Sequence, residues 1–499
     1  MMKLKQLLGI GRLLQGDPEV EVTSVTYDSR RVRPGAVFVA LPGTRTDGHE
    51  YVAEAVARGA AAVVVERSVA APEGVAVLQV ESTRRALSAA AAIFYGDPSR
   101  KLRVIGVTGT NGKTTTTHLI RAILMAQGEK VGLIGTVHNF VGDQELTANL
   151  TTPQASDVQE LMARMVQAGC TYVVMEVSSE GLDMHRVDDV EFDVGVFTNL
   201  TQDHLNYHGT LEQYREAKLG LFRQLARPGA KSGKAAILNR DDPSVDYFRD
   251  AAGSVPIHTY GLDRGADLYA RSLVTTPEGT RFRMGTAQGE LPVALRMVGR
   301  FNVYNALAAA SVALAEGIPL ERIRSVLERQ VGVAGRMEPV RAGQPFGVFV
   351  DYAHSPDGLE NVLTTARGFT RGRVIAVFGC GGDRDRAKRP QMGRIAAILA
   401  DHTIITSDNP RSEEPAAIIR EIESGVREAL PPGHSYETVV DRTEAIERAV
   451  AAAAPGDVVI IAGKGHETYQ IFADRTIHYD DREVARRVIK ARLERKEGA

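Results

Sequence analysis

Short apolar runs rich in valine, isoleucine and alanine alternate along the chain with longer segments of helical periodicity. The runs have the length of strands, and many of them end at glycine, asparagine or aspartate. Strands that are apolar on both faces and alternate with helices are typical of parallel sheets covered by helices on both sides. The pattern therefore predicts the α/β fold class.

Residues 1–98 are predicted to form a small α/β N-terminal domain that ends in a linker at residues 97–101. Its first 14 residues show a mixed apolar and basic helical pattern without the continuous apolar core of a signal peptide. The expected strands are residues 20–25, 36–40 and 61–65, and the expected helices are residues 51–58 and 83–95.

A central domain is predicted over residues 99–332, with a mostly parallel sheet that has helices on both faces. Residues 254–298 differ from the rest, because their short β-like runs suggest an antiparallel insert. The expected strands are residues 103–108, 130–135, 171–177, 193–199, 234–239, 280–284 and 291–297, and the expected helices are residues 118–127, 156–168, 211–225, 302–316 and 320–329.

Residues 333–499 are predicted to form a Rossmann-like C-terminal domain with a second open α/β sheet. Its glycine-rich turn at residues 379–383 does not match the dinucleotide-binding fingerprint. The expected strands are residues 348–352, 374–378, 402–406 and 458–462, and the expected helices are residues 358–367, 391–400, 416–429 and 442–453.

The length of 499 residues fits about three domains, because it is too great for one hydrophobic core. The formal net charge of −2 gives no sign of a nucleic-acid partner. Cys170 and Cys380 are the two cysteines, and both are expected to be free buried thiols in a reducing compartment. We therefore expect a cytoplasmic protein without membrane insertion, since no apolar run has the length of a membrane span. We also expect a monomer, although nothing in the composition fixes the oligomeric state.

The segment Gly109-Thr-Asn-Gly-Lys-Thr114 follows a buried strand and precedes a helix, as a phosphate-binding loop does. Loop amides and the helix dipole favour an anion there. Lys113 would reach the outer phosphates of ATP, and the Thr114 hydroxyl would ligate Mg²⁺. The strict pattern has a glycine where Val107 stands, and an ordinary glycine turn is the alternative.

Polar residues at other strand ends are further candidates for the site. Glu176 ends an apolar strand, and a buried carboxylate needs a partner, either Mg²⁺ or an arginine. His204 is a metal ligand or a helix cap. Asn302 and Asn305 could bind adenine or cap a helix, and Asp351 could accept the ribose hydroxyls or close a turn.

Six motifs in this order resemble those of the Mur ligases, ATP-dependent enzymes that form amide bonds in peptidoglycan synthesis. The resemblance covers essentially the whole chain. The motifs are Gly109-Thr-Asn-Gly-Lys-Thr114, Glu176-Val-Ser-Ser179, Thr198-Asn-Leu-Thr-Gln-Asp-His204, Gly299-Arg-Phe-Asn-Val-Tyr-Asn305, Gly335-Arg-Met-Glu338 and Asp351-Tyr-Ala-His-Ser-Pro-Asp357.

Within this family the chain is most similar to the members that add 2,6-diaminopimelate. Three stretches carry this similarity, and the first implies a UDP-binding N-terminal domain. They are Tyr27-Asp-Ser-Arg30 with residues 43–49, residues 381–390 and Ser407-Asp-Asn-Pro-Arg411. The implied reaction joins meso-2,6-diaminopimelate to UDP-N-acetylmuramoyl-L-alanyl-D-glutamate through an acyl phosphate.

Arg411 offers a physical basis for the choice of amino acid. Diaminopimelate differs from lysine by a second carboxylate, which a guanidinium binds with two parallel hydrogen bonds. Lysine would leave Arg411 unpaired, and an unpaired buried charge discriminates against that substrate. A plain turn at residues 407–411 is the alternative.

The resemblance implies roles for residues in four groups. The ATP-binding group is Gly109, Thr110, Asn111, Gly112, Lys113, Thr114, Thr115, Asn302, Asn305, Arg336 and Asp351. The group for the UDP-sugar-dipeptide is Tyr27, Ser29, Thr44, Arg45, Thr46, Thr151, Thr152, Ser178 and Arg186. The diaminopimelate group is Arg384, Asp408, Asn409, Pro410, Arg411, Gly463 and Glu467. The Mg²⁺ ligands are Thr114, Glu176, His204 and Lys218, and the catalytic residues are Lys113, Glu176, His204 and Lys218.

Lys218 would ligate the metal as a carbamate, although its place in the sequence alone predicts an exposed helix lysine. Glu180 and Met184 stand where many members of the family carry histidine and glutamine, so neither residue is assigned to the site. Three other functions stay open: a lysine-adding homologue, another amino-acid ligase such as a folylpolyglutamate synthase, and a nucleotide-dependent switch without amide chemistry.

Overall fold

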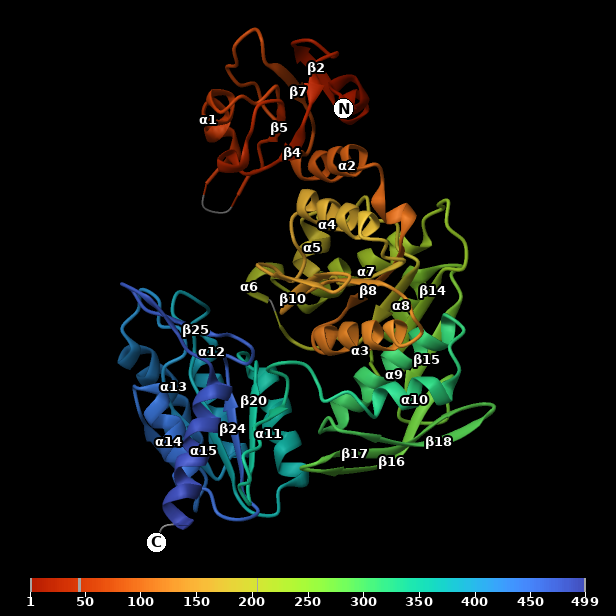
Figure 1. Ribbon diagram of the computed structural model, residues 1–499. Coiled ribbons are helices and arrows are strands. Elements are labelled where there is room, and N and C mark those ends of the chain that lie inside the picture. Colours follow the sequence, from red (N-terminus) through yellow and green to blue (C-terminus); the bar gives the residue numbers. More distant parts are fainter. Residues whose placement is uncertain (1, 44–45, 204, 498–499) are drawn as a thin grey trace.

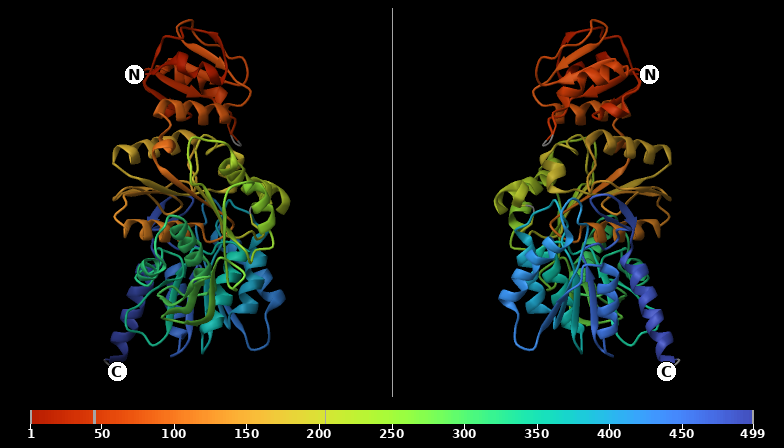
Figure 2. Two further views of the ribbon diagram at one scale, coloured as in Figure 1. Left: turned by 90° about the vertical axis from the view of Figure 1, so that its right-hand side faces the viewer. Right: turned by 90° about the vertical axis from the view of Figure 1, so that its left-hand side faces the viewer.

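The computed structural model describes residues 2–43, 46–203 and 205–497, which form three main sheets with helices packed against them. In Figure 1 the N-terminal sheet lies at one end of the molecule, the largest sheet in the middle and the C-terminal sheet beside it. Both side views in Figure 2 keep the N-terminal sheet at the end away from helix α15 (Asp481–Glu497). The α/β class is confirmed, and the domain limits at residues 98 and 332 stay predictions.

The N-terminal sheet has the order β2-β7-β6-β5-β4, with β4 to β7 parallel and β2 antiparallel to β7. Helix α2 starts after Ser82, whose side chain accepts a hydrogen bond from the backbone of Arg85. The elements are β2 (Arg12–Gln15), β4 (Ser24–Thr26), β5 (Ala36–Val39), β6 (Ala62–Val65), β7 (Ala76–Gln79), α1 (Val52–Ala57) and α2 (Thr83–Tyr95), with the 3-10 helices η2 (Ser29–Arg31), η3 (Gly48–Tyr51) and η4 (Pro98–Lys101).

The helical pattern at the start of the chain does not produce an α-helix. Strand β1 (Met2–Lys3), the 3-10 helix η1 (Leu4–Ile10) and β2 occupy this segment, and β1 pairs with β3 (Glu21–Val22). Gly9 and Gly11 lower the helix propensity here, while Leu4 and Leu7 are buried in the N-terminal core. Tertiary packing therefore decides the local structure.

The central sheet has eleven strands in the order β11-β10-β9-β12-β8-β13-β14-β15-β16-β17-β18. The strands from β9 to β16 in this order are parallel, and the outer pairs are antiparallel. They are β8 (Arg103–Thr108), β9 (Val131–Ile134), β10 (His138–Val141), β11 (Gln144–Thr147), β12 (Tyr172–Glu176), β13 (Val194–Phe197), β14 (Ala235–Asn239), β15 (Ile257–Gly261), β16 (Leu268–Thr276), β17 (Gly279–Thr286) and β18 (Gly289–Leu295).

The expected antiparallel insert at residues 254–298 is only partly confirmed: β16, β17 and β18 pair antiparallel, but β15 pairs in parallel with β14, and the segment is not separate from the sheet. β16 pairs in parallel with β15, and β17 and β18 extend the same sheet beyond it. Apolar residues on one face of β16 to β18, such as Phe282 and Leu295, join the core of the central sheet. Burial of this face explains why the segment continues the sheet.

Helices cover both faces of the central sheet and form two cores. Helix α9 is buried along nearly its whole length, because it packs between the sheet and the helices α3 and α10. On one face lie α3 (Lys113–Met125), α9 (Arg300–Ala315) and α10 (Leu320–Leu327), and on the other α4 (Ala155–Gln167), α5 (Ser179–Asp183), α7 (Leu211–Ala226) and α8 (Val245–Ala252), while α6 is Leu205–His208.

The C-terminal sheet has the order β19-β20-β24-β21-β22-β23, and all its strands except β19 are parallel. Helices α11 to α13 cover one face, and α14 and α15 cover the other. The elements are β19 (Glu338–Pro339), β20 (Gly347–Asp351), β21 (Val374–Phe378), β22 (His402–Ile405), β23 (Ser435–Thr438), β24 (Val458–Ala462), α11 (Pro356–Phe369), α12 (Lys388–Leu399), α13 (Pro415–Ala429), α14 (Arg442–Ala452) and α15, with the hairpin β25 (Tyr469–Ile471) and β26 (Thr476–His478).

Parallel strands gather their carboxyl ends at one edge of each sheet, where open α/β sheets bind ligands. Side-chain hydrogen bonds link these edges of the central and C-terminal sheets. Asp357 at the start of α11 accepts hydrogen bonds from Asn111 Nδ2 (2.6 Å) and Thr201 Oγ1 (3.1 Å). Both partners follow strands of the central sheet, β8 and β13. Among the described residues, no helix has the length and apolar character needed to cross a membrane.

Candidate functional site

The loop between β8 and α3 has the shape of an anion-binding loop. Gly109 and Gly112 have φ angles of +145° and +85°, which only glycine adopts without strain. A side chain at Gly112 would also collide with Asn305 Oδ1. The backbone amide of Asn111 donates to Asn199 Oδ1 (2.9 Å), and this bond fixes the middle of the loop. Glycine at these two positions is therefore a requirement of the fold.

Two lysine side chains converge on this loop. Lys113 Nζ donates to the carbonyls of Gly109 (2.9 Å) and Thr110 (2.8 Å), and Lys218 Nζ donates to the same Gly109 carbonyl (2.8 Å). Lys218 is only 1% exposed, so the expectation of an exposed helix lysine is wrong. Burial lowers the pKa of both amines, and the neighbouring Lys113 cation lowers the pKa of Lys218 further.

Glu176 lies beside the loop at the end of β12 and is fully buried. Its Oε2 accepts hydrogen bonds from Thr114 Oγ1 (2.9 Å) and Thr136 Oγ1 (3.0 Å), and its Oε1 accepts one from the Thr136 amide (2.8 Å). Within the described part of the chain these partners, rather than an arginine, hold the carboxylate. The alternative of an arginine ion pair is therefore wrong.

The residues present at this point fit a hard divalent cation. Thr114 Oγ1 and Glu176 Oε2 lie 2.9 Å apart, and Mg²⁺ prefers oxygen ligands completed by phosphates and water. No group of three or more histidine, cysteine, aspartate or glutamate side chains with metal-ligand geometry occurs among the described residues. His204 lies outside them.

Asn302 and Asn305 project from the first turns of α9 into the space behind the phosphate loop. Gly299 is the N-cap of α9, so the proposed helix-cap role for Asn302 is wrong. The Asn302 amide donates to the Val298 carbonyl (2.9 Å), and Asn305 Nδ2 donates to Asn302 Oδ1 (3.1 Å). Both amides are buried. Thr115 is buried in the first turn of α3.

Asp351 ends β20 at the facing edge of the C-terminal sheet. Its Oδ2 accepts from the Met337 amide (2.6 Å) and its Oδ1 from the Ala353 amide (2.8 Å), so it closes a turn. Burial raises the pKa of its carboxyl group. The neighbouring Arg336 reaches across to the central sheet, where its Nη2 donates to Thr114 Oγ1 (3.4 Å). Arg336 thus lies at the phosphate loop, as an ATP-binding role requires.

Four of the residues expected to bind the dipeptide gather around Glu176. Thr151 Oγ1 lies 3.0 Å from Thr136 Oγ1, and Thr152 Oγ1 donates to the Glu176 carbonyl (2.9 Å). Arg186 Nη1 donates to the Thr152 carbonyl (2.9 Å). Ser178 caps α5 through a hydrogen bond from the Gly181 amide. These residues form one connected wall of the site.

Met184, one of the departures from the family pattern, contacts this wall. Arg186 Nη2 lies 3.0 Å from Met184 Sδ, which is a weak acceptor. A glutamine at this position could offer a stronger oxygen acceptor to the same guanidinium. The substitution thus changes how Arg186 is held.

The residues expected to bind the UDP end lie on the N-terminal unit. Tyr27 Oη donates to Asp157 Oδ2 of α4 (3.2 Å), and Ser29 Oγ donates to Glu54 Oε2 (3.2 Å). Thr46 is exposed. Thr44 and Arg45 lie outside the described residues. The structure therefore does not join this group to the phosphate loop directly.

The residues expected to bind the amino acid follow β21, β22 and β24 at the carboxyl edge of the C-terminal sheet. Asn409 Nδ2 donates to Glu467 Oε2 (2.8 Å), which joins two of these loops. Asp408 Oδ2 is buried and has no hydrogen-bond partner, and Gly463 lies against it. A buried carboxylate oxygen without a partner is suited to receive a substrate ammonium.

Arg411 has the left-handed backbone angle φ +52°, which is strained for a residue with a side chain. Its amide donates to the Ile471 carbonyl (3.0 Å), and its Nη1 donates to the Gly382 carbonyl (2.8 Å). Pro410 precedes it, and Arg384 lies exposed in the facing loop. The guanidinium thus lies against Gly381 and Gly382 of the facing loop.

Some residues of this region were missed by the sequence analysis. Lys464 is fully buried, and its Nζ donates to Asn409 Oδ1 (3.0 Å) and Glu467 Oε2 (3.0 Å). Arg389, also fully buried, pairs with Glu413 and Glu421 below the glycine-rich loop. Lys464 stands in the Gly463–Glu467 motif, and this motif was the sequence signal that could have identified it. The partners of Arg389 lie 24 and 32 residues further along the chain, so these contacts leave no local pattern in the sequence.

We expect the ion pair of Glu413 with Arg389, below the glycine-rich loop, to make the stability of the protein depend on pH. The hydrogen bonds from Arg389 lower the pKa of Glu413 from its ordinary 4.5 to about 2. A lowered pKa contributes stability above pH 4.5 that is lost as the pH falls toward 2. We expect Glu413→Gln to reduce the loss of unfolding free energy between pH 5 and pH 3, as measured by urea titration. Equal losses in the variant and the wild type would contradict this.

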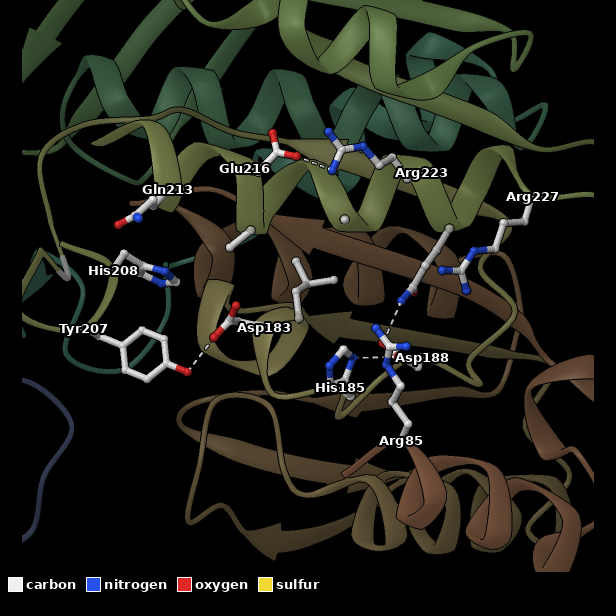
Figure 3. A pocket seen from close by; sticks show the side chains of 14 residues that line it. Arg85, Asp183, His185, Asp188, Tyr207, His208, Gln213, Glu216, Arg223 and Arg227 are labelled. Carbon is white, nitrogen blue, oxygen red and sulfur yellow. Dashed lines mark hydrogen bonds and ion pairs between the residues drawn. The ribbon is translucent and has the colours of Figure 1, made fainter. Parts of the chain in front are cut away.

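A hollow of about 910 Å³ lies on the outer flank of α7, away from these residues (Figure 3). Glu216 and Arg223 of α7 line it from one side, and His185 and Asp188 line it from the other. None of the predicted site residues lines it. Lys218 donates to the phosphate loop instead.

Family profiles and curated relatives match this chain over nearly all of its length. Profiles described as "Mur ligase family, catalytic domain", "Mur ligase middle domain" and "Mur ligase, glutamate ligase domain" match residues 21–95, 107–313 and 335–465. Two curated relatives are UDP-N-acetylmuramoyl-L-alanyl-D-glutamate–2,6-diaminopimelate ligases. The one from Bacillus cereus is 47% identical, covering 96% of each chain. The one from Geobacillus thermodenitrificans is 47% identical, covering 98% of this chain and 100% of its own.

Three solved structures are also similar to this chain. A diaminopimelate ligase of the same description is 33% identical, with a TM-score of 0.70 over 99% of both chains. A MurF ligase from Thermotoga maritima in complex with ADP is 21% identical, with a TM-score of 0.66 over 95% of this chain and 99% of its own. The folylpolyglutamate synthase of Mycobacterium tuberculosis, 19% identical, covers 76% of this chain and 92% of its own with a TM-score of 0.61. The last two share the fold.

Proposed function

The chain belongs to the Mur ligase family, and we propose that it is an ATP-dependent ligase that joins 2,6-diaminopimelate to UDP-N-acetylmuramoyl-L-alanyl-D-glutamate. One observation carries this proposal. Asp408, Asn409, Arg411 and Glu467 gather at the carboxyl edge of the C-terminal sheet, and contacts from Arg336 and Asp357 bring that edge to the phosphate loop.

The proposed chemistry has two steps. The side-chain carboxylate of the D-glutamate attacks the γ-phosphorus of ATP, ADP leaves, and an acyl phosphate forms. The neutral amine of diaminopimelate then attacks the acyl carbon, phosphate leaves, and the amine gives up a proton. Lys113 stabilises the negative charge on the transferring group. Since several reactants must meet, positioning supplies much of the rate enhancement.

Mg²⁺ held by Thr114 and Glu176 would neutralise charge on the phosphates during this transfer. We place ATP on the loop amides and Lys113, with Asn302 and Asn305 at the back of the site. The dipeptide lies along Thr151, Thr152, Ser178 and Arg186, and the UDP end lies on the N-terminal unit. We further propose a monomer that works in the cytoplasm.

Carbamylation of Lys218 is part of the proposal. A lysine must be neutral to react with CO₂, and burial beside Lys113 lowers the pKa of Lys218 well below its ordinary value. The Nζ atom already lies at the Gly109 carbonyl. A carbamate there would turn a cation beside the phosphate loop into an anionic oxygen ligand for the metal.

Lys218→Ala is expected to lower kcat on the order of 100-fold, because the site loses a charged ligand. Acetate or propionate should restore part of the activity, since a small carboxylate can enter the space left by the side chain. Phosphate release with and without added acetate measures this. Lys234→Ala is the control, because Lys234 donates to carbonyls at the far end of α7. Full activity of Lys218→Ala without any carboxylate would contradict the carbamate role.

The decisive test of the function is phosphate release from ATP with the UDP-muramoyl-dipeptide, with and without diaminopimelate. We expect release to depend on both substrates and to be slow with L-lysine. Faster release with lysine would indicate the lysine-adding homologue. Phosphate release that does not depend on the UDP-muramoyl-dipeptide but requires a folate substrate would indicate a folylpolyglutamate synthase. Release independent of any amino acid would overturn the ligase proposal.

A further inference from the structure

Arg442 and Asp481 form an ion pair inside the C-terminal unit, and both side chains are fully buried. Arg442 begins α14, and Asp481 begins α15. The pair is bidentate, with Nε 2.7 Å from Oδ1 and Nη2 2.8 Å from Oδ2. The aspartate holds the guanidinium in one orientation, which leaves its outer donors aimed at the sheet.

The outer donors of Arg442 bind two backbone carbonyls at the carboxyl edge of the sheet. Nη1 donates to the Ser407 carbonyl (3.1 Å), and Nη2 donates to the Ala462 carbonyl (2.9 Å). Ser407 directly precedes Asp408, and Ala462 directly precedes Gly463. One side chain therefore holds the starting points of both loops that carry the expected amino-acid ligands.

β22 and β24 do not pair with each other, because β21 lies between them in the sheet. The guanidinium of Arg442 joins the two strand ends directly. On the ligand side, the same two loops meet through Asn409 Nδ2 and Glu467 Oε2 (2.8 Å). The distance between Asn409 and Glu467 depends on where the two loops begin.

We propose that Arg442, held by Asp481, is a positioning residue that sets the distance between the 408–411 and 463–467 loops for amino-acid binding. Fold stability is a weak explanation for the pair, because apolar residues of similar volume stabilise a core about as well as a buried ion pair. The proposal rests on the assignment of these loops to diaminopimelate, and it predicts a defect confined to that substrate.

The main test is the double variant Arg442→Met/Asp481→Leu, which removes both charges of the ion pair. We expect a thermal midpoint close to that of the wild type. The KM for diaminopimelate should rise roughly 10- to 100-fold, as expected for misplaced ligands, while the KM values for ATP and the UDP-muramoyl-dipeptide stay unchanged. An unchanged KM for diaminopimelate would overturn the proposal, as would an equal rise in all three KM values.

Arg442→Lys is the second variant, and it decides the matter if the double variant does not fold. Lysine keeps a cation opposite Asp481 but cannot reach two carbonyls in fixed directions. We expect the same selective rise in KM, and a wild-type KM would overturn the proposal. Arg373→Met is the matched control: Arg373 also binds an aspartate, Asp457, and a backbone carbonyl, but at the opposite edge of this sheet.

Hydrogen exchange gives a readout that does not depend on activity. In both Arg442 variants, the amides of residues 408–411 and 463–467 should exchange faster, while those of β20 and β21 keep their protection. Unchanged exchange in both loops would overturn the positioning role. If the wild type shows no diaminopimelate-dependent phosphate release, the proposed function fails, and the exchange result still shows whether Arg442 sets the loops.

Discussion

Replacing Lys113 with methionine is expected to lower the rate of phosphate release by roughly 1000-fold, the cost of losing one preorganised charge at a developing anion. Lys113 Nζ already lies at the mouth of the loop, where it donates to the Gly109 and Thr110 carbonyls. Burial lowers the pKa of this amine, but bound phosphates would favour its charged form. Methionine keeps the length and the apolar stem of the side chain, so the loop should fold as before.

Steady-state phosphate release at saturating substrates measures this effect, and nucleotide binding by calorimetry separates binding from chemistry. Lys130→Met is the matched control, because Lys130 Nζ also donates to a backbone carbonyl, that of Ala168 (2.6 Å), but far from the loop. A Lys113→Met variant within tenfold of the wild-type kcat would mean that the loop binds phosphate without stabilising its transfer.

Much of the fold could be predicted from hydrophobic patterning. Buried parallel strands such as β12 and β24 are continuous apolar runs that end at polar residues, so their limits fall within a residue or two of those predicted. Several strands were missed, among them the buried β7 and the nine-residue β16. Others, such as β19 and β23, are short or exposed and form because a neighbouring strand offers hydrogen-bond partners. Such strands depend on long-range pairing and leave no periodic pattern of their own.

The phosphate loop and Glu176 could be predicted because their chemistry is local: glycines at special φ angles, a lysine, and a carboxylate that ends a buried strand. The burial of Lys218 could not, since it follows from the packing of α7 against the loop, more than 100 residues away. The same holds for Asp357, which contacts Asn111 across 246 residues. Contacts between distant elements need the tertiary structure.

Polar contacts join the facing edges of the two sheets, and this shapes the proposed catalysis. Asp357 binds Asn111 in the middle of the phosphate loop, and Arg336 reaches Thr114 at its end. Both contacts come from the C-terminal unit. Any movement of that unit therefore changes the surroundings of the phosphates and the amino-acid loops together, which is how closure could align the acyl phosphate with the incoming amine.

Arg411→Ala should cause the largest change in substrate choice. Removing one partner of a buried, hydrogen-bonded charge pair costs roughly 2–5 kcal/mol, which corresponds to a loss of about 30-fold to several thousand-fold in kcat/KM for diaminopimelate. The kcat/KM for lysine should stay the same or rise, because lysine has no second carboxylate and no longer leaves a guanidinium unpaired. The preference for diaminopimelate over lysine should therefore collapse.

The geometry around Arg411 supports this expectation. The backbone is strained at φ +52°, and the Arg411 amide is tied to Ile471, so the side chain is held with its Nη1 at the Gly382 carbonyl (2.8 Å). Strain of this kind persists only where the surroundings enforce one conformation. Arg394→Ala, which removes an exposed arginine paired with Glu428, should leave both values of kcat/KM unchanged. An Arg411→Ala enzyme that still prefers diaminopimelate to the wild-type degree would show that recognition of the second carboxylate lies elsewhere, with Arg384 in the facing loop as the next residue to replace.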